Sequence, residues 1–225
     1  MKNKMNNNRI NYVVFNNKIK QRRLVFYPVA KNANSSAKLF FLRHLKLEKN
    51  YHFVYDEKPA YTLVNDKDFK SFDPKYDIVN FMPSYTPFSK VDAEEKCCIV
   101  REPLQRFISA YKNRVLYHRD KAFNNFSIDE VIEKLEIGDF QNRHFLPQTY
   151  WLGFNLNYFT ITASVNNLKT FIDNVNNFFE NFVEFPKIQT GGTNLKITLN
   201  DDQIKKIKKI YQSDYELIGD FIRKF

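Results

Sequence analysis

The chain has 225 residues, which is enough for one α/β domain with a full hydrophobic core, and 23 Phe and 13 Tyr supply that core. With only 5 Gly and 8 Pro, the composition excludes collagen-like, low-complexity and largely disordered proteins. The formal net charge of +10 suits phosphates, nucleic acids, anionic glycans or an acidic membrane surface, so charge alone does not choose among these partners.

The cysteines and histidines indicate neither a disulfide nor a metal site. Cys97 and Cys98 are neighbours in an apolar run, so we expect them to point to opposite faces of a strand. The four histidines are scattered without metal-ligand spacing. The basic N-terminus lacks the apolar stretch of a signal peptide, and no run of roughly 18 apolar residues occurs. We therefore expect a metal-free cytoplasmic protein without a transmembrane segment, whose charge also suits peripheral contact with an anionic membrane.

Hydrophobic periodicity predicts alternating strands and helices. Residues 1–22 are polar and basic and are predicted to form an N-terminal arm, frayed or paired at a sheet edge, ahead of a single domain over residues 23–225. Residues 24–30 are typical of a strand and residues 37–45 of a helix. Further strands are predicted at 51–55, 77–82, 96–100 and 158–163, and further helices at 103–117, 165–182 and 200–225. This order predicts an α/β fold with a mainly parallel central sheet flanked by helices.

The polar loop at residues 31–38 has the features of a phosphate site. A strand, a loop and a helix in succession bring backbone N–H groups and the positive end of the helix dipole to one point. Lys31 offers a mobile charge, and Lys38 lies about one turn inside the helix. Ser35 and Ser36 offer hydroxyls, although residue types alone are more typical of an ordinary βα turn with a serine N-cap. A Walker-type ATPase or GTPase is disfavoured because the Gly-x-x-x-x-Gly-Lys-Ser/Thr pattern is missing.

A second phosphate site is predicted after the strand at residues 96–100. The stretch reads Val100-Arg101-Glu102-Pro103-Leu104-Gln105-Arg106-Phe107-Ile108-Ser109-Ala110-Tyr111. Pro103 suits a first helical turn, and an apolar stripe follows it. Arg101 at the end of the strand and Ser109 two turns into the helix are suited to hold a phosphate between them.

This stretch resembles the Val-Arg-Asp-Pro-x-x-Arg-x-x-Ser-x-Tyr signature of the carbohydrate sulfotransferases that use 3′-phosphoadenosine-5′-phosphosulfate (PAPS). That family includes the Golgi chondroitin and heparan-sulfate enzymes and their bacterial relatives. The resemblance implies a P-loop-like three-layer fold, PAPS as cofactor with PAP as product, and a cofactor 3′-phosphate held by Arg101 and Ser109. It also implies that the earlier loop holds the 5′-phosphosulfate through Lys31, Asn32, Asn34, Ser35, Ser36 and, as an auxiliary cation, Lys38.

Two departures from the family pattern stand out. Glu102 replaces the commoner Asp, and Ala33-Asn34 stands where the 5′ loop of the family has glycine. The bulkier side chains affect how closely the backbone approaches the cofactor. A degenerate member that binds PAP without catalysis therefore stays open as an alternative.

Three further segments are similar to bacterial members, in the same order. Residues 139–148 resemble an Asn/Asp-x-His-Phe/Trp-x-Pro-Gln segment, and residues 158–169 resemble a strand followed by Asn-Leu. Residues 210–215 resemble a closing Tyr-x-x-Asp-Tyr/Phe helix, although taken alone they are more typical of core packing. The resemblance runs from about Leu24 to Phe225.

The implied reaction is in-line transfer of a sulfuryl group to a hydroxyl of a glycan or glycolipid. Such a transfer needs positioning and charge stabilisation more than covalent work by the protein. We assign Lys31 to the leaving group and take His144 as the candidate base, since an imidazole suits neutral pH. A histidine beside Phe145 is equally typical of a packed residue. Some relatives have a base histidine before the Arg-Asp-Pro strand, but residues 80–85 contain none.

Other residues are candidates for contacts around the cleft. Arg143 and Gln148 are expected to bind or orient the acceptor. His118 is a further candidate for the acceptor groove, although its charged surroundings are more typical of a solvated surface. Lys196 follows two neighbouring glycines, which predict either a flexible loop that closes over the cofactor or a plain connector.

Two other classes of protein remain as alternatives. A basic nucleic-acid-binding protein would use the +10 charge and surface aromatics, but no binding motif supports it, and we expect no dedicated nucleic-acid partner. An ATP-dependent phosphotransferase would use magnesium with a P-loop-like site. The favoured role is sulfation of a carbohydrate acceptor in bacterial polysaccharide biosynthesis, before export. The sequence gives no indication of the oligomeric state.

Overall fold

We describe the fold from a computed structural model. It describes residues 12–48, 52–55, 58–61, 74–81, 88–123, 125–140, 142–188, 191–192 and 194–223. Residues 1–11 of the predicted arm lie outside this description. The same is true of residues 82–85 in the region searched for a second base histidine.

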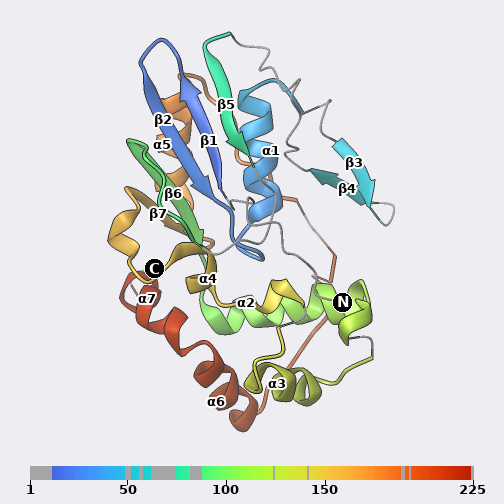
Figure 1. Cartoon of the computed structure of the whole chain (residues 1–225). Helices are drawn as coiled ribbons and strands as arrows, with labels where there is room; N and C mark the ends of the chain where they lie inside the picture. Colours follow the sequence, from blue (N-terminus) through green and yellow to red (C-terminus); the bar gives the residue numbers. More distant parts are fainter. Residues whose placement is uncertain are drawn as a thin grey trace, which may run out of the picture.

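A mainly parallel sheet forms the centre of the protein (Figure 1). In the described residues it has five strands in the order β5-β1-β2-β6-β7. They are β1 (Val13–Asn17), β2 (Arg22–Tyr27), β5 (Tyr76–Phe81), β6 (Glu95–Val100) and β7 (Ile161–Ser164). Strand β6 pairs in parallel with β2 and β7, while β1 pairs antiparallel with both β2 and β5. All strands of this sheet except β1 thus run in one direction, which confirms the predicted α/β class.

The predicted N-terminal arm over residues 1–22 is wrong at its C-terminal end. Strand β1 lies inside the sheet between β5 and β2, and the side chains of Val13, Val14 and Phe15 are buried. The apolar stretch is short and flanked by Asn and Lys, so the sequence pattern did not indicate a strand. Strand β1 pairs with β2 on one side and with β5 on the other. Its pairing with β2 through the turn at residues 18–21 makes it part of the core rather than an edge.

Helices cover both faces of the sheet. Helices α1 (Asn34–His44) and α5 (Lys169–Phe179) pack on the face that carries Phe15, Phe26 and Cys97. Helices α4 (Gln148–Leu152) and α7 (Gln212–Ile222) pack on the opposite face, against Val25, Tyr27 and Cys98. Cys97 and Cys98 therefore point to opposite faces, as predicted, and both thiols are free.

A group of helices lies beyond the carboxyl end of the sheet (Figure 1). Helix α2 (Pro103–Ala110) continues as a π-helix, η1 (Tyr111–Tyr117), and packs with α3 (Ile128–Glu136) and α6 (Asp201–Ile210) around Phe107, Phe145 and Tyr211. The predicted helix at 103–117 is thus one continuous element with a change of pitch, and the one predicted at 200–225 is divided at Tyr211. No helix in the described ranges is long and apolar enough to cross a lipid bilayer.

Short elements complete the chain. A separate hairpin consists of β3 (His52–Tyr55) and β4 (Lys58–Tyr61). The described ranges also contain the 3-10 helices η2 (Lys121–Phe123), η3 (Arg143–Phe145) and η4 (Leu156–Tyr158).

The carboxyl ends of β2 and β6 bring the two predicted phosphate-binding segments to the same edge. In the parallel ladder Tyr27 lies beside Cys98, so the loop after β2 and the turn after β6 leave the sheet next to each other. In open α/β sheets, ligands bind outside the carboxyl ends of the strands. We therefore expect a functional site at this edge of the sheet.

The buried His44 at the end of α1 makes stability depend on pH. Its ring packs against Phe40 and Phe179 at centroid distances of 4.6 and 4.7 Å, and burial lowers its pKa to about 4 from 6.5. Between these values the unfolded chain binds a proton that the folded chain does not. We expect the free energy of unfolding to fall by up to about 3 kcal/mol as the pH drops from 6.5 to 4, measured by urea denaturation.

The variant His44→Phe keeps the aromatic packing and removes the titration. Asn181, which shares a hydrogen bond with His44, is exposed, so water replaces the lost partner. The pH dependence should become shallower in this variant. An unchanged slope would assign the acid sensitivity to another group.

Candidate anion-binding site

The loop between β2 and α1 has a strained backbone. Lys31 and Ala33 have φ values of 70° and 55°, in the left-handed region where glycine is the usual residue. Each costs on the order of 1 kcal/mol, so the surroundings must hold the loop in place. Ala33 is the N-cap of α1 and no side chain caps the helix, which leaves Ser35 and Ser36 inside its first turn. The initial N–H groups of α1 therefore have no capping side chain and suit an anion.

Asn32 attaches this loop to strand β6. Its Nδ2 donates to the carbonyl oxygen of Ile99 at 2.8 Å and to Oε1 of Gln148 at 2.6 Å. Gln148 pairs in turn with the backbone of Arg101, accepting from its N–H at 3.0 Å and donating to its carbonyl oxygen at 2.8 Å. The three residues form one buried hydrogen-bond network that sets the position of the loop relative to the end of β6.

These contacts show how two predicted site residues are held. Gln148, predicted to bind the acceptor, is 0% exposed, and both ends of its amide are engaged with Asn32 and Arg101. Asn32, predicted to contact the cofactor, is 1% exposed, and its side chain donates to Ile99 and Gln148. Both amides position the loop, and their ligand contacts stay predictions. Sequence spacing does not distinguish an amide directed inward from one directed at a ligand.

Arg106 connects the loop to the segment that carries His144. Its Nε donates to the carbonyl oxygen of Ala30 at 3.0 Å, and its Nη2 donates to the carbonyl oxygens of His144 and Leu146 at 3.1 and 2.6 Å. The guanidinium is buried and lies 5.2 Å from the ring centroid of Trp151. Sequence reasoning assigned Arg106 no role, although its place in the signature motif was a signal.

The closing motif at residues 211–215 reaches the other segments. The hydroxyl of Tyr211 donates to the carbonyl oxygen of Phe145 at 2.6 Å. The carboxylate of Asp214 accepts from the N–H groups of Gln148 and Thr149 at 2.8 and 2.9 Å, which caps helix α4. Residues described as core packing thus also fix the geometry around the site.

Glu102 links the signature turn to the same motif. Its carboxylate accepts from the N–H of Gln105 at 2.6 Å, as the N-cap of α2, and also accepts from the hydroxyl of Tyr215. The departure from Asp is therefore accommodated structurally, since Glu fulfils the cap and reaches Tyr215.

Four cationic side chains come together at this edge without an equal number of carboxylates. Burial, together with the nearby Arg114, Arg101 and Arg106, lowers the pKa of Lys31 to about 7. Arg101 also donates through Nη1 to the carbonyl oxygen of Lys31 at 3.1 Å. Burial likewise lowers the pKa values of Arg101 and Arg106. Such an excess of half-buried positive charge favours an anionic ligand.

The remaining predicted cofactor contacts lie around this cluster in different environments. Burial lowers the pKa of Lys38, on α1, to about 8. The Ser36 hydroxyl accepts from the N–H of Ile188 at 3.2 Å, so it contacts a later segment of the chain. Asn34 buries an Oδ1 atom that has no hydrogen-bond partner. Ser35 on α1 and Ser109 on α2 are half-buried.

The glycine-containing loop before Lys196 lies against the π-helix η1. A Cβ atom on Gly191 would come within 2.5 Å of the Tyr117 ring, and one on Gly192 within 2.7 Å of the Lys112 carbonyl oxygen. Both glycines also have positive φ. Lys196 itself is exposed, and residues 189–190 and 193 of the loop lie outside the described residues. The two glycines permit a close approach to η1, and the predicted cofactor contact of Lys196 stays a prediction.

His144 is brought to the same cluster. Its pKa is lowered to about 3, mainly by burial and then by Arg114, Lys31, Arg106 and His118. The imidazole is therefore neutral at pH 7 and able to accept a proton. His118, at the C-terminal end of η1, packs against the Tyr117 ring.

The structure thus unites Lys31, Arg101, His118 and His144, all predicted from sequence. Arg143, expected to bind the acceptor, is exposed on η3. No group of three or more His, Cys, Asp or Glu side chains suited to a metal ion is present in the part of the chain described here.

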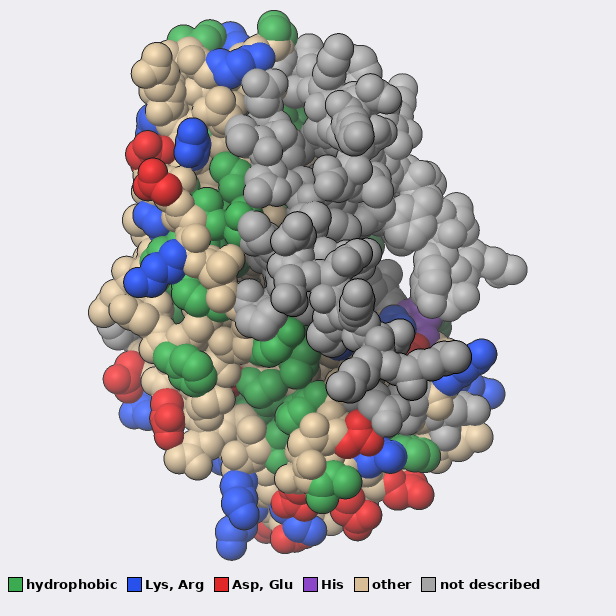
Figure 2. Space-filling model, viewed as in Figure 1, with side chains coloured by type: hydrophobic (Ala, Val, Ile, Leu, Met, Phe, Trp, Pro, Cys, Tyr) green, Lys and Arg blue, Asp and Glu red, His purple; other side chains and the backbone are tan. Residues whose placement is uncertain are grey.

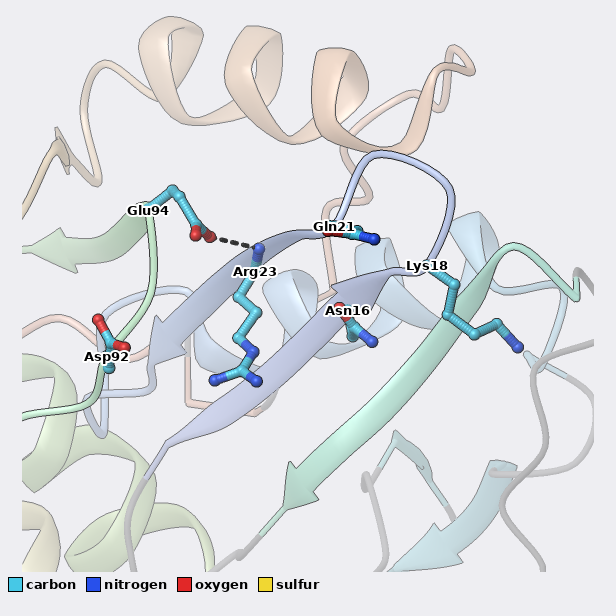
Figure 3. Close-up of a pocket in the computed structure, with 6 residues that line it drawn as sticks. All are labelled: Asn16, Lys18, Gln21, Arg23, Asp92 and Glu94. Atoms are coloured by element: carbon cyan, nitrogen blue, oxygen red, sulfur yellow. Dashed lines mark hydrogen bonds between the residues drawn. The ribbon is translucent and has the colours of Figure 1, made fainter.

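A separate hollow of about 500 Å³ lies at the opposite end of the sheet (Figure 3). It is lined by Asn16, Lys18, Gln21, Arg23, Asp92 and Glu94. Arg23 donates its backbone N–H to Glu94 at 2.6 Å, near the start of strands β2 and β6. It contains none of the predicted site residues and its charges are mixed, so we assign the function to the cationic edge.

The fold and the cationic edge define an α/β protein with a cluster of cationic side chains at the carboxyl ends of parallel strands. The model of the sulfotransferase family matches residues 18–219. The chain therefore belongs to the sulfotransferase family, whose general activity is sulfuryl transfer. No curated protein and no solved structure matches the chain.

Arg106→Met tests the connection between the loop and the His144 segment. The substitution leaves the carbonyl oxygens of Ala30, His144 and Leu146 without their donor. We expect a loss of about 3 kcal/mol or more in the free energy of unfolding, measured with urea. Gln105→Met, at the adjacent exposed position of α2, is the matched control and should change stability by less than about 0.5 kcal/mol. Equal effects of the two substitutions would contradict this role for Arg106.

Proposed function

We propose that the protein is a carbohydrate O-sulfotransferase that transfers the sulfuryl group of PAPS to a hydroxyl of a glycan or glycolipid. The observation that carries the proposal is the meeting of Lys31 and Arg101 beside the α1 N-terminus, with a pKa of Lys31 near 7. A lysine with so low a pKa among arginines is complementary to a ligand with several negative charges.

The residues at this edge fit the two charged ends of PAPS. Lys31, Ser35 and the first N–H groups of α1 are suited to the 5′-phosphosulfate, with Lys38 as an auxiliary cation. Arg101 directly follows β6 and Ser109 lies on α2, and both are suited to the 3′-phosphate. When bound, PAPS supplies the sulfuryl group, and PAP is the product that remains.

Binding an anion would activate the groups assigned to the chemistry. Negative charge close to Lys31 raises its pKa, so that its ammonium group becomes fully charged where charge develops on the leaving phosphate. The same field raises the pKa of His144 from about 3, which makes the neutral imidazole a stronger base. The acceptor hydroxyl gives its proton to this imidazole during transfer.

The surface charge gives less support to a nucleic-acid-binding protein. On the face in Figure 2, the described Lys and Arg side chains are interspersed with Asp and Glu over the lower helices. Four cationic side chains, Lys31, Arg101, Arg106 and Arg114, instead lie near one another at the end of the sheet. This distribution is better suited to a small ligand with several charges than to a long polyanion.

Titration with PAP tests the cofactor directly and requires no knowledge of the acceptor. We expect micromolar binding of PAP by calorimetry, with AMP much weaker because it lacks the 3′-phosphate. Arg101→Ala should weaken PAP at least about tenfold, since a charged hydrogen bond contributes about 1.5–3 kcal/mol. Arg23→Ala removes the same charge at the far end of the sheet and should leave the affinity unchanged.

Equal PAP affinity in the wild type and Arg101→Ala would contradict the assignment of the 3′ site. Binding of ATP or RNA without binding of PAP would place the chain in one of the other two classes. PAP binding without transfer to any acceptor would indicate a degenerate member of the family.

Proton uptake on binding tests the state of Lys31. With a pKa near 7, Lys31 is mostly neutral at pH 8, and bound PAP should restore its charge. We expect uptake of about one proton at pH 8, measured by calorimetry in buffers of different ionisation enthalpy. The uptake should be largely lost in Lys31→Met, whereas Lys38→Met should remove only a smaller part. The same uptake in Lys31→Met and the wild type would contradict the role of Lys31.

A further inference from the structure

A line of hydrogen bonds connects Arg114 to His144 through two side chains that sequence reasoning did not single out. Arg114 donates to both carboxylate oxygens of Asp120, through Nε at 2.8 Å and Nη2 at 2.7 Å. Asn142 donates from Nδ2 to Oδ2 of Asp120. The Oδ1 atom of Asn142 lies 2.8 Å from Nδ1 of His144 and also accepts from the His144 backbone N–H at 3.1 Å.

The order of donors and acceptors along this line determines where the imidazole proton is. An ionised carboxylate only accepts hydrogen bonds, so Asp120 requires the NH₂ end of the Asn142 amide. The amide oxygen then faces His144, and because this oxygen also only accepts, Nδ1 must carry the proton. In a neutral imidazole the proton-accepting lone pair is consequently on Nε2.

Packing restricts the alternatives to this arrangement. Asn142 is buried, and as the N-cap of η3 it is held by the backbone N–H of His144 as well as by the ring. Asp120 is fixed by its two-pronged pairing with Arg114, which extends from the π-helix η1. Turning the amide over would put its NH₂ group against the N–H of His144 and its oxygen against the carboxylate.

We infer that Asp120 and Asn142 are positioning residues that hold His144 in the Nδ1–H tautomer, so that Nε2 receives the proton of the acceptor hydroxyl. The inference rests on the proposed function. As the hydroxyl oxygen bonds to sulfur, its proton passes to Nε2, and the S–O bond to the 5′-phosphate breaks with its electron pair remaining on PAP.

The charges around His144 support a neutral imidazole before the reaction. Arg114 and His118 face it from η1, Lys31 faces it from the loop after β2, and Arg106 faces it from α2. These groups and burial lower the pKa of His144 to about 3. In the pairing with Arg114, both carboxylate oxygens of Asp120 accept from the guanidinium.

The tautomer can be measured without any substrate. The imidazole nitrogens of the ¹⁵N-histidine-labelled full chain distinguish Nδ1–H, Nε2–H and imidazolium by their NMR shifts, and His144→Gln identifies the signals of His144. We expect Nδ1–H between pH 6 and 8. A His144 that is predominantly Nε2–H, or protonated in this range, would overturn the inference.

Variants separate positioning from a merely structural contribution. Asn142→Leu removes the acceptor, keeps the branching at Cγ and should abolish the preference for Nδ1–H. The double variant Asp120→Asn with Asn142→Asp exchanges amide and carboxylate, keeps the net charge, and again offers Nδ1 an acceptor. It should retain the Nδ1–H tautomer. Retention of that tautomer in Asn142→Leu would show that another group holds the ring, and the inference would fail.

The same proteins distinguish failure of this inference from failure of the proposed function. PAP binding with the wrong tautomer would overturn the inference alone, and the expected tautomer without PAP binding would overturn the proposed function alone. With an acceptor that the wild-type protein sulfates, Asn142→Leu should lower the transfer rate on the order of 10²-fold with little change in PAP affinity. The double variant should recover most of this loss, and its carboxylate beside His144 should move the acid limb of the pH–rate profile to higher pH.

Discussion

The buried guanidinium of Arg106 is the interaction on which the site depends. It bonds to backbone carbonyl oxygens on two segments far apart in sequence, the loop after β2 and the segment of His144. Burying a charge without a paired carboxylate is unfavourable, so these carbonyl bonds and the Trp151 ring must compensate. Because the same group is bound to both segments, neither can move without exposing or unpairing it. The spacing between Lys31 and His144 is fixed in this way.

The family-like segments are physically joined, which explains why they occur together in one chain. Gln148 pairs with the backbone of Arg101, and Asp214 caps the helix that Gln148 begins. Tyr215 bonds to Glu102 in the signature turn. Each motif is thus completed by atoms of another. Removing one partner would leave a buried polar atom of another segment unsatisfied, so the segments depend on one another.

The sequence was sufficient for the fold class and for the residues that meet at the sheet edge, but not for their individual roles. Periodicity located β2, β6 and α2 because their apolar patterns are strong. Strand β1 was not predicted because polar residues flank its short apolar stretch and because one of its partners, β5, is distant in sequence. Lys31, Arg101 and His144 were found through motifs. Arg106, Asp120 and Asn142 were not assigned roles, and the contacts of Gln148 with Asn32 and Arg101 were not foreseen, because the direction of a polar side chain is decided by tertiary contacts.

The site accumulates unfavourable features that a bound anion would relieve together. Two non-glycine residues have left-handed backbone conformations. Burial and the nearby arginines hold the pKa of Lys31 far below its usual value, and burial and the same cations lower the pKa of His144 to about 3. Their repulsion is tolerated because Arg106 and the Gln148 network hold the backbone. A ligand carrying several negative charges would replace this repulsion with attraction, so relief of the repulsion would contribute to binding. The same charges would bring Lys31 and His144 to the protonation states that the transfer requires.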